Sequence, residues 1–159
     1  MKLILFILAA FLTSGSYAQV TPLEQLNFGK IVISDNQSVS SITLLPSNTN
    51  TLTNKIYLLE KGHAAELLLE GYPARIQVNV SDFVSDQPLN NIFGGASLIL
   101  NQLIYNATIT TDTTGTALLR VGGQLSTSGD GNTYKDGIFD TTIEVTDRKS
   151  TRLNSSHVF

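Results

Sequence analysis

The sequence of 159 residues contains no cysteine. A chain without cysteine has neither a disulfide nor a thiol nucleophile, which excludes a disulfide-stapled domain, a cysteine hydrolase and a thiol redox protein. The fold must therefore be held by its apolar core and by backbone hydrogen bonds. This favours a regular β-sheet over a loop-rich architecture.

Positive charge is scarce in the main part of the chain. Residues 19–146 contain six Lys or Arg against twelve Asp or Glu, a net charge of −6. Contacts to nucleic-acid phosphates need clustered cations, so we expect no nucleic-acid partner. No cofactor is expected either, because no motif for one is present.

Long apolar runs are also missing, apart from Leu3 to Leu12. A membrane-spanning helix needs about 20 apolar residues, so this run is too short to be a membrane anchor, which is the alternative. Lys2 precedes it, and small residues follow at Ser16 and Ala18, as in a secretory signal peptide. We expect residues 1–18 to be a cleaved signal peptide. The mature protein is then exported to the periplasm, cell surface or extracellular space, with no membrane span.

The last residues do not resemble the rest of the chain. Asp147 to His157 match the in-frame translation of a common sequencing adapter. We expect residues 147–159 to be a non-native tail, and residues 19–146 to form a single β-sandwich domain. The alternative is a genuine basic tail that binds nucleic acid or a membrane.

Hydrophobic residues alternate with polar ones, which is typical of half-buried strands. Ile76, Val78 and Val80 share one face, and residues 139–145 are expected to form one strand with Phe139, Ile143 and Val145 inward. Further strands are expected at residues 27–33, 38–45, 55–59, 65–69, 97–105, 107–111 and 117–125, with turns between them that include 61–63. Short strands at this spacing predict an all-β antiparallel sandwich or barrel.

The sequence contains few candidates for catalytic or metal-ligating residues. His63 is the one histidine outside the tail, and we expect it in a solvated Lys-Gly-His turn, because no nucleophile or metal-ligand spacing accompanies it. Asp130, Asn132 and Asp136 fall at alternate positions of a glycine-rich loop, a partial match to a calcium loop. The alternative is an ordinary hairpin loop. We expect no enzyme activity and no metal, and keep these three residues as the calcium candidate.

Three segments resemble a bacterial family, domain of unknown function 4402. They are residues 26–32, 119–125 and 137–146, whose order and spacing fit that family. The family is similar in pattern to fimbrial and pilin-like subunits. The resemblance implies an immunoglobulin-like or pilin-like antiparallel β-sandwich. Its incomplete sheet is filled by a strand from a like subunit, with an assembly chaperone and usher as further partners.

We therefore expect a non-enzymatic cell-envelope subunit that assembles by β-strand complementation. The mechanism needs an open sheet edge above an apolar groove, and the strand carrying Phe139, Ile143 and Val145 is expected to border that edge. The alternative is a monomeric periplasmic or surface module that binds glycan or calcium through its loops.

Overall fold

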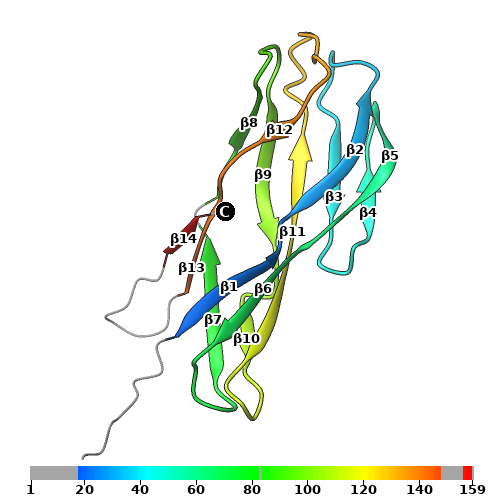
Figure 1. Cartoon of the computed structure of the whole chain (residues 1–159). Coiled ribbons are helices and arrows are strands. Elements are labelled where there is room, and N and C mark those ends of the chain that lie inside the picture. Colours follow the sequence, from blue (N-terminus) through cyan, green and yellow to red (C-terminus); the bar gives the residue numbers. More distant parts are fainter. Residues whose placement is uncertain (1–17, 83, 148–155, 159) are drawn as a thin grey trace, which may run out of the picture.

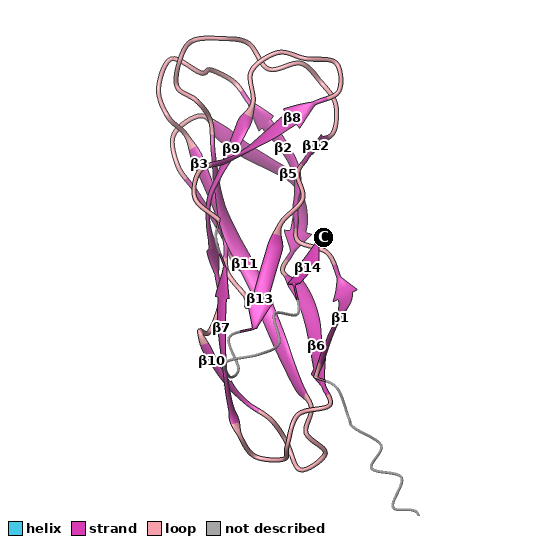
Figure 2. Cartoon of the chain, turned by 90° about the vertical axis from the view of Figure 1, so that its left-hand side faces the viewer, coloured by secondary structure: helices cyan, strands magenta, loops and turns pink. Residues whose placement is uncertain are grey.

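The computed structural model describes residues 18–82, 84–147 and 156–158. These residues form β-strands joined by turns and loops, with no helix among them (Figures 1 and 2). Every strand pair is antiparallel. The predicted all-β antiparallel class is confirmed. The expected signal peptide, except Ala18, and most of the expected tail lie outside the described residues.

The largest sheet has the strand order β1-β6-β11-β9-β8-β12, with β3 beside β11 and β4 beside β3. The first half of β11 pairs with β6 and its second half with β3, while β9 follows its other edge. The strands are β1 (Gln19–Glu24), β3 (Ser41–Leu44), β4 (Asn50–Leu52), β6 (Ala65–Glu70), β8 (Gln87–Asn91), β9 (Leu98–Ile104), β11 (Ala117–Ser126) and β12 (Phe139–Asp140).

Two smaller sheets lie against this one. The first has the order β10-β7-β13-β14 and the second is the pair β2-β5. Ser156–Val158 of the expected tail pairs with Glu144–Thr146. The strands are β2 (Asn27–Ile33), β5 (Ile56–His63), β7 (Gln77–Asp82), β10 (Thr108–Thr110), β13 (Glu144–Asp147) and β14 (Ser156–Val158).

The core has two parts, one for each half of the elongated molecule. In the lower half of Figure 1, Val78 and Val80 of β7 join a cluster with Leu67, Leu69 and Leu119 from the largest sheet. In the upper half, a second cluster joins Ile42, Ile56, Leu89, Leu98, Leu100 and Leu125, and partly buried side chains of β2 pack against it. The β2–β5 pair covers this upper half of the largest sheet, and β7 covers the lower half.

The chain changes sheet where β1 leads into β2 and β5 into β6. The β1–β2 segment runs antiparallel to β5–β6 along its whole length. Gly29 has φ +84°, and a Cβ there would lie 2.1 Å from the Glu60 carbonyl oxygen. A Cβ on Gly62 would lie 1.8 Å from the Asn27 carbonyl oxygen. The two backbones approach too closely for any larger residue, which explains both glycines.

Most predicted strands are present, some with shifted ends. Val78 and Val80 are buried at 0% and 7% exposure, and Gln77 and Asn79 on the other face are exposed, as the alternation predicts. The predicted turn at 61–63 is wrong, because these residues belong to β5. The reason is that Gly62 serves the close approach of two strands, and a glycine in that role has the same sequence signature as a turn.

The expected single strand at 139–145 is also wrong, because these residues contribute to two short strands, β12 and β13, instead of one. Phe139–Asp140 pairs with β8 in the largest sheet, whereas Val145 pairs with Asp82 of β7 in another sheet. The chain leaves one layer and enters the other between these two short strands. Tertiary pairing therefore overrides a local alternation that would suit one strand.

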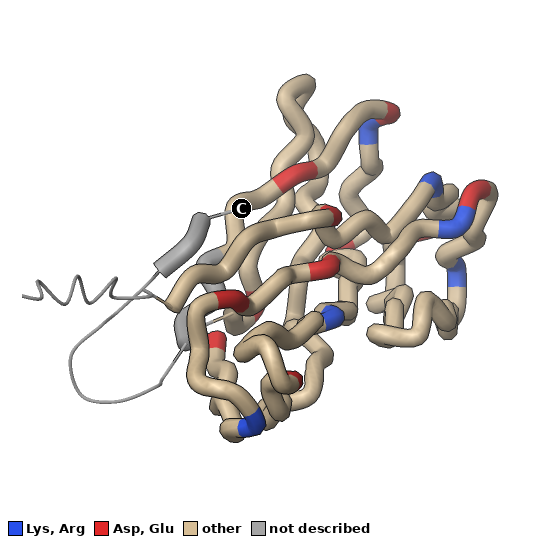
Figure 3. The backbone as a smooth tube through the Cα atoms, turned by 60° about the horizontal axis from the view of Figure 1, so that its bottom comes forward, with Lys and Arg blue, Asp and Glu red and all other residues tan. Residues whose placement is uncertain are grey.

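Charged positions of both signs are interspersed along the described backbone (Figure 3). Two of the basic residues lie beside a carboxylate: Lys30 is 3.6 Å from Glu60 and Arg120 is 2.7 Å from Glu66. Within the described residues, no helix is long and apolar enough to span a membrane.

Candidate functional site

The candidate site is an open groove between β2 and β12. β2 pairs with β5 through one edge, and β12 pairs with β8 through one edge. Among the described residues, no strand lies along the other edge of either one. Each open edge presents backbone N–H and C=O groups that a further strand could bind.

The groove has a volume of about 860 Å³ and an apolar lining. Ile31 and Ile33 of β2 stand on one side, and Phe139 and Ile143 on the other. Its lining also includes the charged residues Glu24, Lys30, Lys135, Asp136 and Asp140. The floor comes from residues of β8, β9 and β11, namely the buried Leu89, Leu98, Leu100, Val121 and Leu125 and the partly buried Leu103.

These floor residues belong to the hydrophobic core itself. Leu98, Leu100 and Leu125 are 3%, 1% and 2% exposed, so the groove ends on side chains of the buried core. Covering more of this surface would be favourable by about 25 cal/mol for each Å² of apolar area removed from water. The groove is thus an apolar slot flanked by two strand edges with open hydrogen-bonding groups.

Two of the three residues predicted to border an open edge line this groove. Phe139 is partly buried and its ring packs against Tyr134, with centroids 6.1 Å apart. Ile143 contacts both core clusters from the segment between β12 and β13. Val145 lies in β13, paired through its backbone with Asp82, and its side chain lies outside what the structure describes.

The calcium candidates are only partly brought together. The backbone N–H of Asn132 donates to Asp130 Oδ1 at 2.9 Å, and Asn132 Nδ2 donates to Asp130 Oδ2 at 2.8 Å. These hydrogen bonds and one from the Ser128 hydroxyl lower the pKa of Asp130. Asp136 is exposed and shares no hydrogen bond with the other two in the described structure. The carboxylate of Asp130 is therefore already bound by N–H donors.

Asn36 organises this loop, which the sequence did not indicate. The side chain is 6% exposed. Its Nδ2 lies 2.9 Å from Asp130 Oδ1, 2.8 Å from the Asn132 carbonyl oxygen and 3.0 Å from Ser128 Oγ, and its Oδ1 accepts from Gly129 N–H at 2.9 Å. Two amide hydrogens serve three acceptors, so at least one bond is shared. No sequence signal links residues that are more than 90 positions apart.

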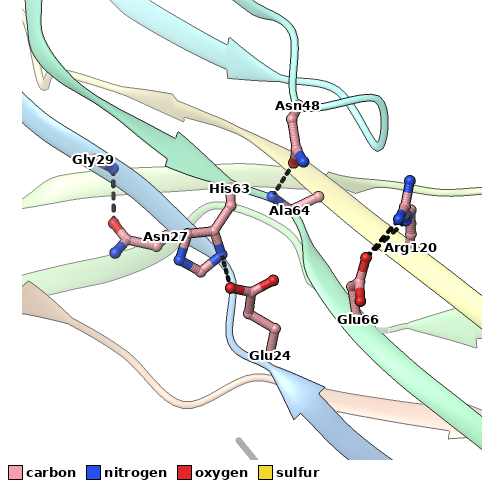
Figure 4. Close-up of polar contacts among 8 residues, drawn as sticks. All are labelled: Glu24, Asn27, Gly29, Asn48, His63, Ala64, Glu66 and Arg120. Atoms are coloured by element: carbon pink, nitrogen blue, oxygen red, sulfur yellow. Dashed lines mark hydrogen bonds and ion pairs between the residues drawn. The ribbon is translucent and has the colours of Figure 1, made fainter.

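His63 lies at the change of sheet, in the last position of β5 (Figure 4). Its Nδ1 is 3.4 Å from Glu24 Oε1, a contact without hydrogen-bond geometry. The expected turn is wrong, because His63 belongs to a strand, and its side chain is 37% exposed. Within the described residues, no group of three His, Asp or Glu side chains could hold a metal ion.

Polar contacts around His63 fix the backbone where the strands change sheet. The Gly29 N–H donates to Asn27 Oδ1 and the Ala64 N–H to Asn48 Oδ1, each at 2.7 Å (Figure 4). Arg120 donates to Glu66 Oε1 from Nε at 2.9 Å. The contacts of Asn27 and Asn48 satisfy backbone N–H groups, and the Arg120–Glu66 contact joins side chains of β11 and β6. They support a structural role for this region and hold β2 in place beside the groove.

No family model, curated protein or solved structure matches this chain. The resemblance to domain of unknown function 4402 stays a prediction.

Proposed function

We propose that this protein is an exported, non-enzymatic subunit of a cell-envelope assembly, and that it binds an extended strand of a partner in the groove between β2 and β12. The observation that carries the proposal is the pair of open strand edges above a floor of core leucines. Strand addition suits such a groove, because main-chain hydrogen bonds supply affinity and alternate side chains fill apolar pockets.

The groove lining supports binding of a strand more than chemistry on a substrate. Its walls are aliphatic or aromatic at Ile31, Ile33, Phe139 and Ile143. An active site would need convergent polar groups placed for acid, base or nucleophilic roles. A strand with apolar side chains at alternate positions would cover the floor and continue the sheet. The partners we propose are like subunits, with an assembly chaperone and usher.

Hydrogen exchange on the purified chain would test the groove. Protein at rising concentration, or with a synthetic peptide of residues 19–28, should slow amide exchange in β2 and β12 while leaving β7 unchanged. Ile143→Asp should remove this protection, because it places a charge on the apolar wall. Tyr57→Asp is the matched control, since Tyr57 is 52% exposed and lies outside the groove lining. Unchanged exchange in β2 and β12 under both conditions would contradict the proposal.

A second candidate is a monomeric module that binds glycan or calcium. A cleft of about 680 Å³ favours it, lined by apolar residues that include Pro88 and Ile99 and by polar residues that include Asp86, Asp130 and Asn132. The hydrogen bonds that already occupy Asp130 count against calcium. Millimolar calcium should therefore leave the melting temperature unchanged, and a clear upward shift would favour this candidate.

A further inference from the structure

Three large apolar side chains are exposed together at one end of the molecule. Ile92 and Phe93 follow β8 and are 79% and 64% exposed, and Ile138 precedes β12 and is 74% exposed. Because Phe139 pairs with Asn91, Ile138 and Ile92 are neighbours one step beyond that pair. We call these three residues the apolar ledge. Figure 1 shows both segments near the upper end of the molecule.

The ledge is held by a fixed scaffold. Asn91 is 7% exposed, accepts from the Phe93 N–H at its Oδ1 and donates from Nδ2 to the Lys135 carbonyl oxygen, both at 2.9 Å. Lys135 Nζ donates to the Phe93 carbonyl oxygen at 2.9 Å. These bonds join the two segments that carry the ledge. A surface fixed in this way loses little conformational entropy when a partner binds.

The ledge is continuous with the groove. Ile138 lines the groove together with Phe139, although most of its side chain is exposed. The three side chains present on the order of 400 Å² of apolar surface, which is a typical size for a functional patch. A stable interface buries about 800 Å² on each partner, so the ledge is too small to act alone. It is large enough to form one interface together with the groove.

The charges nearby favour a polypeptide over a lipid surface. Asp136 and Asp140 flank Ile138, and Lys135 directs its amine to the Phe93 carbonyl oxygen. Anionic lipid headgroups attract clusters of free Lys and Arg side chains, whereas the charged residues that flank Ile138 are acidic and the Lys135 amine is already bound to a carbonyl oxygen. An apolar, rigid and mildly acidic ledge suits the body of a folded protein.

We propose that the ledge docks the body of a second copy of this chain, whose strand occupies the groove. This inference rests on the proposed function. The chain itself can supply the strand, because β1 is an edge strand in which only Val20 is buried. Its release from β6 would uncover little apolar surface from the core. The ledge then adds a contact that the strand alone does not make.

Sedimentation velocity of the full chain would test the ledge, with three sets of variants. Ile92→Ser with Phe93→Ser alters the ledge outside the groove lining, and Ile31→Asp, or the milder Ile31→Ser, alters the groove. Leu52→Ser with Tyr57→Ser is the control, since these residues are 37% and 52% exposed and lie outside both surfaces. The ledge variant should weaken self-association at least about tenfold, as loss of two central anchors does. Its melting temperature and the control's association should match the wild-type values.

Binding of the synthetic peptide of residues 19–28 separates the two proposals. The ledge variant should bind this peptide as tightly as the wild type does, because the peptide has no folded body. If the ledge variant binds the peptide and associates with itself as strongly as the wild type does, the ledge proposal is wrong and the groove proposal stands. If the groove variant still associates with itself, both proposals are wrong. Both are also wrong if the wild-type chain neither associates nor binds the peptide. Ledge-dependent binding of phosphatidylglycerol vesicles, without self-association, identifies a lipid surface and overturns the proposed partner.

Discussion

Gly29 provides a direct test of how the chain changes sheet. Gly29→Ala places a methyl group 2.1 Å from the Glu60 carbonyl oxygen, on a residue whose φ is +84°. The left-handed backbone costs about 1–2 kcal/mol for a residue with a Cβ. Forcing the two backbones apart adds about 1–3 kcal/mol, as for other over-packed sites. We expect Gly29→Ala to lower the free energy of unfolding by roughly 2–5 kcal/mol.

Gly131→Ala is the control, because Gly131 has a similar φ of +80° and no atom within 4 Å of the added Cβ. It should lose only the backbone part, about 1–2 kcal/mol. Urea unfolding followed by circular dichroism measures both losses. With a slope of about 1–3 kcal/mol per molar urea, the midpoint of Gly29→Ala should fall by about 0.7–5 M. Equal losses in the two variants would refute the close approach of β2 and β5.

Three further predictions concern polar side chains. Asn36→Ala should cost about 2–4 kcal/mol, because it removes a buried hydrogen-bonding hub, and should speed proteolysis within residues 128–137. Hydrogen bonds from Thr114 and Thr116 hold the pKa of Asp112 well below its usual range, so its stabilisation is present above about pH 4 and is lost as the pH falls. Asp112→Asn should therefore make the free energy of unfolding, measured by denaturation at different pH values, depend less on pH in this acid range. Burial and the hydrogen bond to Asp82 raise the pKa of Tyr105 to about 12. Its stabilisation is lost as the pH rises from about 10 to 12, and Tyr105→Phe should remove that loss.

Alternation in the sequence predicted the strands whose one face enters the core. Ile76, Val78 and Val80 alternate with polar residues, and β7 buries that face. β8 was not predicted from the sequence. Its residues are Gln-Pro-Leu-Asn-Asn, and only Leu89 gives the hydrophobic signal of an inward-facing position. Its partner β9 supplies the ladder that places these residues in a strand. Local propensity could not show this pairing.

Half of the candidate site could be predicted from the sequence. Phe139 and Ile143 were expected beside an open edge, and both line the groove. The opposite wall, with Ile31 and Ile33, was recognised only as a strand. Its position depends on where β2 leaves β1's sheet, which Gly29 and Gly62 determine through a contact between distant segments. A glycine gives the same sequence signal at a turn and at a close approach of two strands.

The change of sheet and the groove are consequences of the same geometry. β1 adds to the edge of β6, but β2 follows β5 across to the other layer, so the edge of β2 faces β12 instead of another strand. On the other side, the chain leaves β12 after two residues and joins β7 as β13. Both walls of the groove therefore end in strands that switch layers. If this is correct, Gly29→Ala should weaken binding of the synthetic 19–28 peptide under conditions where the protein is still folded, because it displaces one wall. Gly131→Ala should leave that binding unchanged, since Gly131 does not line the groove.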